Sequence, residues 1–295
     1  MSSGKPVKYL VFDNDGVNVD SEHVAMRVMD DFGHALVKRY KPDADLKPGD
    51  IYGEYPGTST DKIIQMLGIK YDLPGDHIRE DYGIGSDEFI PEALAGRVTI
   101  ATNEAFASGL KTVDGITDSL AALQARYGAG NMALCTTSRE DRMNVSIECA
   151  ADPRTGKNAG LAAVFPKGER RVSGYGHDNK YVLFFSKSGW NPEETVVIED
   201  SISGVTKAKA ANPALRVVGT AAAVFYEYSA AQAARLIEAG ASIVVTAGDD
   251  LAKAVAWLDS GFDPAQSPCF SSKVYRARHE ECFPGTKPAG PKPAP

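Results

Sequence analysis

Two aspartates stand two residues apart where an apolar run ends near the N-terminus. Residues 9–12 (YLVF) lead directly into Asp13, Asn14, Asp15 and Gly16. A carboxylate can attack phosphorus to give an aspartyl-phosphate, and a second one can protonate the leaving oxygen and later activate water. Carboxylates are also ligands for Mg²⁺, which usually takes one or two from a protein. Alone, this short motif is more typical of an ordinary acidic turn.

A second pair of acids, Glu199 and Asp200, follows the apolar run 195–198 (TVVI). Acids that directly follow a buried run are costly unless they pair or coordinate. They can complete a metal site opened by Asp13. They also suit a helix N-terminus that Ser201 or Ser203 would cap, and the two interpretations are compatible.

Hydroxyl groups and a lysine supply the remaining polar candidates. Thr136, Thr137 and Ser138 follow the apolar run 132–135, where hydroxyls and free N–H groups can bind phosphate oxygens. Lys180 can neutralise a transferring phosphoryl group. Three other lysines compete for that role: Lys157, Lys167 and Lys187.

These polar clusters need elements that bring them together. We predict buried strands at 9–12, 132–135, 195–198, 215–219 and 242–245, and helices at 114–127, 181–187, 203–211 and 230–239. Strands that alternate with helices predict an α/β fold with a parallel sheet. Ligands bind at the carboxyl ends of such strands, which is where each polar cluster lies.

Residues 20–110 break this alternation. They contain two amphipathic segments, 24–37 and 59–67, among turns rich in Gly, Pro and Asp. We therefore expect an α/β core formed by residues 1–19 and 111–283, with a mainly helical domain at 20–110. The stretch 152–178 is interpreted as a loop with a short β-element at 161–165. Residues 284–295 are rich in Pro, Gly and Lys and are expected to be a disordered tail.

The composition of the chain limits the classes of molecule that we expect it to bind. The 295 residues carry a formal net charge of −7, so neither nucleic acid nor an anionic membrane is an expected partner. The N-terminus lacks the apolar stretch of a signal peptide, and no run is long enough to span a bilayer. The cysteines form no CxxC pair, so we expect reduced thiols and a cytoplasmic location; they are Cys135, Cys149, Cys269 and Cys282. Oligomeric state is left open.

Together the clusters resemble the haloacid dehalogenase (HAD) superfamily of hydrolases, in the same order along the chain. The opening motif reads FDNDGVNVDSE over 12–22, and the last reads VIEDSISGV over 197–205. The residues of these two motifs are similar to those of the subgroup that contains β-phosphoglucomutase and the phosphoglycolate and sugar-phosphate phosphatases. The resemblance implies a Rossmann-like core with an inserted, mainly α-helical C1 cap domain.

The resemblance also implies roles. Asp13 would be the nucleophile and Asp15 the general acid and base. Lys180 would orient Asp13 and would also bind the phosphoryl group, together with Thr136 and the backbone of Thr137.

The cofactor implied by the resemblance is Mg²⁺. Asp13, the backbone carbonyl of Asp15 and Asp200 would hold the ion. Glu199 would support it without direct contact. The expected reaction is hydrolysis of a small phosphomonoester, such as a sugar phosphate, through an aspartyl-phosphate.

Two positions depart from the subgroup pattern. The motif lysine is usually followed by Pro, whereas here Lys180 precedes Tyr181, and the interval from Lys180 to Asp200 is short. Asn18 stands where an apolar residue is usual, and we interpret it as a variation at the surface or the cap hinge.

The sequence also bears on four other functions that proteins of this superfamily have. Asp15 disfavours dehalogenation, because dehalogenases of this superfamily lack the second aspartate. No lysine lies at 21–24 to form the imine of a phosphonate hydrolase. A phosphosugar mutase would need a second basic phosphate site on the cap, for which the candidates are Arg27, Lys38, Arg39, Lys62, Lys70, Arg79 and Arg97. The alternative of another class is a non-catalytic HAD-fold binding or regulatory protein, which the complete set of acids disfavours.

Overall fold

The computed structural model describes residues 5–55, 58–223, 229–260 and 270–271. The chain divides into two compact units, one formed by Met1–Ser21 with Gly109–Pro295 and the other by Glu22–Ser108. The tail expected at 284–295 lies outside the described residues, as do Cys269 and Cys282.

The first unit is built on a seven-stranded sheet with the order β3-β2-β1-β4-β5-β6-β7. Strands β1 to β6 are parallel, and β7 pairs antiparallel with β6. The prediction of an α/β core with a parallel sheet is confirmed. The strands are β1 (Tyr9–Phe12), β2 (Met132–Thr136), β3 (Arg171–Ser173), β4 (Thr195–Glu199), β5 (Arg216–Thr220), β6 (Ile243–Val245) and β7 (Phe270–Ser271).

Strand β1 lies between β2 and β4, with Val11 opposite Ala133 on one side and Val197 on the other. Between their polar ends these strands are apolar and buried, because both faces of a parallel sheet are covered by helices. The three strands run in the same direction, so the loops that follow them leave from one edge of the sheet.

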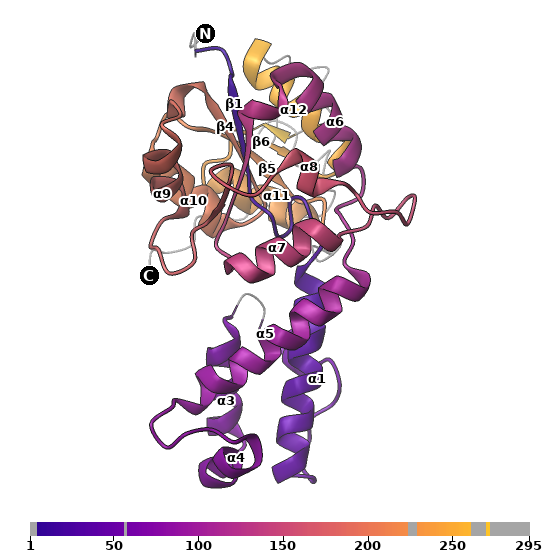
Figure 1. The fold of residues 1–295 in the computed structure, drawn as a ribbon, viewed down its shortest axis with the longest axis vertical. Helices are drawn as coiled ribbons and strands as arrows, with labels where there is room; N and C mark the ends of the chain where they lie inside the picture. The colour runs from indigo at the N-terminus through magenta and orange to yellow at the C-terminus, as the bar shows by residue number, and fades with distance from the viewer. Residues whose placement is uncertain (1–4, 56–57, 224–228, 261–269, 272–295) are drawn as a thin grey trace. The chain divides into compact units, whose positions relative to one another are not determined.

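Helices cover both faces of this sheet (Figure 1). Residues of α9, α10 and α11 pack in one apolar cluster with Val11, Ala133 and Val197. On the other face α12 contacts β5, β6 and α6. The helices of this unit are α6 (Ile116–Tyr127), α7 (Glu140–Cys149), α8 (Leu161–Val164), α9 (Lys180–Ser188), α10 (Ile202–Ala211), α11 (Ser229–Glu238) and α12 (Leu251–Ser260).

The β-element predicted at 161–165 is wrong. Leu161–Val164 forms the short helix α8, which begins after Gly160 in a left-handed conformation (φ 70°). The strand in this stretch is β3, whose Arg171 is buried and donates from Nε to the carbonyl of Phe165 at 2.9 Å. An arginine in a three-residue strand hides the apolar signal on which a strand prediction depends.

The second unit is all helical: α1 (Glu22–Tyr40), α2 (Asp50–Glu54), α3 (Thr60–Lys70), α4 (Gly75–Tyr82) and α5 (Ile90–Gly109). It has an apolar core of its own, to which α1, α3 and α5 contribute Leu36, Ile63 and Leu94. Each unit therefore buries a separate core.

Among the described residues, no helix is both long enough and apolar enough to cross a membrane. Cys135 and Cys149 are free thiols.

Candidate active site

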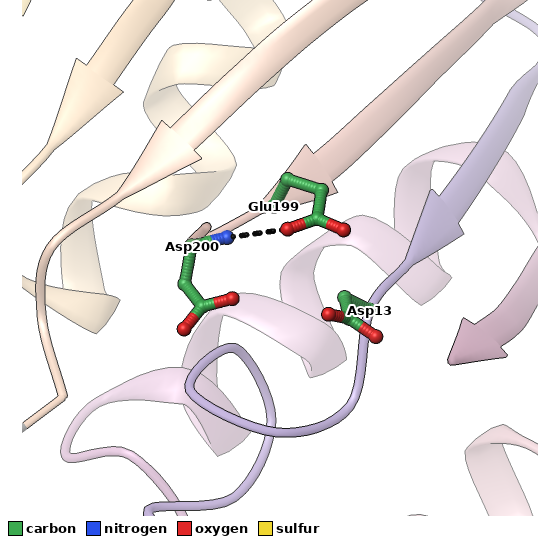
Figure 2. A group of neighbouring side chains, drawn as sticks. All are labelled: Asp13, Glu199 and Asp200. Carbon is green, nitrogen blue, oxygen red and sulfur yellow. Dashed lines mark hydrogen bonds between the residues drawn. The ribbon is translucent and has the colours of Figure 1, made fainter. Parts of the chain in front are cut away.

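Three carboxylates meet at the carboxyl edge of the sheet. Asp13 directly follows β1, while Glu199 ends β4 and Asp200 comes next. Each offers one oxygen, and these oxygens all lie within 4.8 Å of one another (Figure 2). All three residues are buried. Because buried carboxylates repel one another in a medium of low dielectric constant, such a cluster requires positive charge nearby.

Lys180 supplies that charge. Its Nζ lies 2.9 Å from Asp13 Oδ1 and 2.6 Å from Glu199 Oε1, and its side chain is 2% exposed. Lys180 is the first residue of α9, which Asn179 caps by accepting from the backbone N–H of Tyr181 at 3.0 Å. Gly174 allows the loop after β3 to pass close by, since a Cβ there would lie 2.5 Å from Lys180 Cβ.

The pKa values of Asp13, Glu199 and Lys180 are shifted in different directions. Burial raises the pKa of Asp13 to about 7, and the charge of Glu199 adds to this, although Lys180 opposes it. Burial also acts to raise the pKa of Glu199, but Lys180 and the hydrogen bonds to Glu199 outweigh it and lower that pKa. Burial acts to lower the pKa of Lys180, but the two carboxylates raise it, so the ammonium stays charged.

Both carboxylate oxygens of Glu199 accept hydrogen bonds from several donors. Besides Lys180, the hydroxyl of Tyr181 donates to its Oε1 at 2.9 Å. Its Oε2 accepts from the backbone N–H groups of Asp200 and Ser201 and from the Ser201 hydroxyl, each at 3.1 Å. Glu199 therefore orders the site and has little capacity left to bind a metal directly.

The donor set fits a hard divalent cation. Three carboxylates and one ammonium leave two negative charges when all are ionised, and the oxygens of Asp13 and Asp200 are of the type that Mg²⁺ binds. Gly16 has a φ of 75°, and a Cβ at that position would collide with Asp200 Oδ2. A glycine there lets the Asp200 carboxylate lie against the loop that carries Asp13.

Asp15 is held by a different set of groups. The hydroxyl of Ser21 donates to Oδ1, that of Ser138 donates to Oδ2 at 2.6 Å, and Arg142 lies 3.4 Å from Oδ1. Burial acts to raise the pKa of Asp15, but Arg142 and the two serines outweigh it and lower that pKa. The loop after β2 and helix α7 thus position this second aspartate.

Asn18 is fully buried, so the interpretation of a surface variation is wrong. Its side-chain Nδ2 donates to the backbone carbonyl of Asp13 at 2.7 Å, and the backbone carbonyl of Asn18 accepts from Val113 N–H at 3.1 Å. An apolar residue at this position could not make the first bond. Asn18 therefore secures the backbone of Asp13 and joins it to the segment at 113.

The threonines occupy different environments. Thr136 is buried at the end of β2, and its carbonyl accepts from Gly174 N–H at 2.7 Å. Its hydroxyl accepts from Ser138 N–H at 3.1 Å. Thr137 is exposed. Since Ser138 contacts Asp15, the loop after β2 lies beside the loop after β1.

The competing lysines lie elsewhere. Lys157 and Lys187 are exposed, and Lys167 pairs with the exposed Glu148 at 2.7 Å. Sequence reasoning assigned no role here to four residues that contact the acids: Asn18, Ser21, Arg142 and Tyr181. For two of these four residues, Asn18 and Tyr181, the sequence did carry a signal, because both depart from the subgroup pattern.

Comparison with known proteins shows the family of this chain. The family model for haloacid dehalogenase-like hydrolases matches residues 7–212. The chain belongs to this family. A comparison with curated proteins found no match.

Solved structures share the fold. A conserved haloacid dehalogenase-like protein of unknown function from Agrobacterium tumefaciens is 21% identical, with 85% of this chain and 99% of that chain covered and a TM-score of 0.61. A candidate β-phosphoglucomutase from Thermotoga maritima is 19% identical, with 85% and 99% covered and a TM-score of 0.57. A predicted phosphoglycolate phosphatase from Haemophilus somnus is 13% identical, with 84% and 97% covered and a TM-score of 0.59.

Proposed function

We propose that the protein is a Mg²⁺-dependent phosphatase that hydrolyses a small phosphomonoester through an aspartyl-phosphate on Asp13. The observation that carries this proposal is the buried contact of Lys180 with both Asp13 and Glu199. A carboxylate nucleophile attacking a phosphate faces repulsion between negative charges, and a cation fixed beside it reduces that repulsion.

Asp13 and Asp15 have different tasks in the proposed reaction. In the first step, an oxygen of Asp13 bonds to phosphorus while the bond to the leaving oxygen breaks, and Asp15 gives that oxygen a proton. In the second step, Asp15 takes a proton from water, whose oxygen bonds to phosphorus as the bond to Asp13 breaks. The contacts of Arg142, Ser21 and Ser138 favour ionised Asp15, so we expect them to loosen when substrate binds.

Asp13 and Asp200 are the proposed metal ligands, together with the backbone carbonyl of Asp15. Glu199 is proposed to act through Lys180 and the Asp200 backbone. When bound, Mg²⁺ would offset negative charge on the transferring phosphoryl group. Thr136 and the backbone of Thr137 are proposed to bind the oxygens of that group.

We propose that the helical unit Glu22–Ser108 is the cap that selects the substrate. Five of the cations considered for a second phosphate site already have partners within this unit. Lys38 and Arg79 donate to backbone carbonyls, as does Arg97, while Arg39 pairs with Asp81 and Lys70 with Glu54. These pairings disfavour five of the seven candidate cations as the second phosphate site, which a mutase needs in order to bind a bisphosphate at both ends.

The substrate we expect is a small phosphorylated metabolite rather than a nucleic acid. A cytoplasmic location fits the free thiols of Cys135 and Cys149.

The test is phosphate release from a panel of phosphorylated metabolites, with and without Mg²⁺. We expect Asp13→Asn to lower turnover about a thousandfold or more while the protein stays folded. Acid-quenched wild type should yield a peptide phosphorylated at Asp13 by mass spectrometry. Asp118→Asn, at an exposed position on α6, is the matched control and should retain activity. Full activity of Asp13→Asn, or isomerisation of a sugar phosphate without phosphate release, would overturn the proposal.

A further inference from the structure

The residue after the lysine of the site is a buried tyrosine. Tyr181 is fully buried, and its ring packs in the apolar cluster that contains Val11 and Val197. Its hydroxyl donates to Glu199 Oε1 at 2.9 Å. A buried hydroxyl that bonds to a buried carboxylate is a strong, directional contact.

The same carboxylate oxygen also holds the lysine. Lys180 Nζ lies 2.6 Å from Glu199 Oε1 and 2.9 Å from Asp13 Oδ1, so one ammonium is shared between two acids. The ammonium also lies 5.0 Å from the centroid of the Tyr181 ring. Tyr181 thus contacts both the lysine and the acid that competes with Asp13 for it.

We propose that Tyr181 is a positioning residue whose hydroxyl sets where Lys180 lies between Glu199 and Asp13. This inference rests on the proposed role of Asp13 as the nucleophile. A carboxylate oxygen accepts along two lone-pair directions, and the tyrosine hydroxyl occupies one of them at Glu199 Oε1. Without that hydroxyl, Lys180 becomes the only side-chain donor described at this oxygen and moves toward Glu199.

A lysine drawn toward Glu199 neutralises less charge beside Asp13. The charge that develops on the phosphoryl group during its transfer is then less well stabilised, so the effect falls on the chemical step. Substrate binding should change less than turnover, because Thr136 and the backbone of Thr137 are also proposed to bind the phosphoryl group. The subgroup pattern has Pro after the motif lysine, and Pro has no side-chain donor, whereas this chain has the Tyr181 hydroxyl at that position.

The variant Tyr181→Phe isolates the hydroxyl, because it keeps the ring and its contact with Lys180. We expect kcat for phosphate release to fall about tenfold, with KM unchanged to within about twofold. Both proteins are assayed at one temperature below their melting transitions. In the Glu199→Gln background, Tyr181→Phe should have little further effect, because the hydroxyl acts through the Glu199 carboxylate.

Tyr127→Phe is the matched control, since the Tyr127 hydroxyl also faces a carboxylate, that of Asp259 at 3.4 Å. It should leave kcat unchanged. An unchanged kcat for Tyr181→Phe would overturn the inference, as would an equal fall in the Glu199→Gln background. Loss of the fold in Tyr181→Phe would assign the hydroxyl to the architecture and overturn it too. A wild type that releases no phosphate refutes the proposed function itself, whereas an active wild type with an equally active Tyr181→Phe refutes only this inference.

Discussion

Two cations of the first unit each hold several carboxylates, in opposite environments. Lys180 is 2% exposed, and its partners Asp13 and Glu199 are 10% and 0% exposed. Arg154 is 42% exposed and pairs with three aspartates that are 50% to 74% exposed. These three aspartates are Asp114, Asp118 and Asp249.

The count of ion pairs would rank Arg154 first, but burial reverses the ranking. Water screens the charges around Arg154, so each pair there contributes little. Around Lys180 the carboxylates have lost their water, and removing their cation leaves buried charge without compensation. A cation therefore matters for function where its partners cannot turn to solvent.

Removing the buried ammonium of Lys180 should have a larger effect than any other substitution considered. Lys180→Met should destabilise the protein by about 3–5 kcal/mol, because two buried acids lose their partner. It should also abolish most phosphate release. Denaturant unfolding and the phosphatase assay measure the two effects. Lys187→Met, at an exposed position on the same helix, is the control and should match wild type. A Lys180→Met protein as stable as that control would contradict the ranking.

A second variant tests a neutral contact at the same site. Asn18→Leu removes the donor to the Asp13 carbonyl without much change in volume, and should cost about 1–3 kcal/mol of stability. Turnover should fall as well, since the backbone of Asp13 loses a fixed position. Asn158→Leu removes two bonds of an exposed Asn, which donates to the carbonyl of Glu148 and accepts from Gly160 N–H, and should still cost less. Equal losses for the two variants would argue against a special role of burial.

The buried carboxylate of Asp13 should make both stability and metal binding depend on pH. Its pKa is raised to about 7, above the unfolded value, chiefly by burial. Without metal, this group therefore favours folding below its unfolded pKa, and that contribution is lost as pH rises through 7. Because Mg²⁺ needs the ionised form, its apparent Kd should rise about tenfold for each pH unit below 7. Calorimetric titration from acidic to neutral pH measures this, and an affinity independent of pH would refute it.

The smallest effect belongs to the exposed cluster. Arg154→Ala should lower the melting temperature only slightly, and the difference should shrink further in high salt. Turnover should be unaffected. Melting curves at low and high ionic strength provide the measurement. A loss of stability comparable to that of Lys180→Met would show that exposure does not decide the strength of these ion pairs.

The outline of the fold could be predicted because buried parallel strands appear in the sequence as unbroken runs of apolar residues. The runs ending before Asp13, Thr136 and Glu199 each form a strand, and the polar residues that follow them lie at one edge of the sheet. Strand β3 escaped prediction because Arg171 occupies one of its three positions. Helix α5 lies in a region of the helical unit where sequence reasoning identified only turns.

The sequence by itself determined the fold class, the order of the motifs and the acids that lie at the ends of β1 and β4, because short-range patterning encodes each of these. Only the tertiary structure decided that Lys180, rather than another lysine, contacts Asp13, and that Asn18 and Tyr181 hold the site from within the core. Such contacts join residues on different elements. The physical reason is that burial, which gives them their strength, depends on the packing of the whole unit and not on the local sequence.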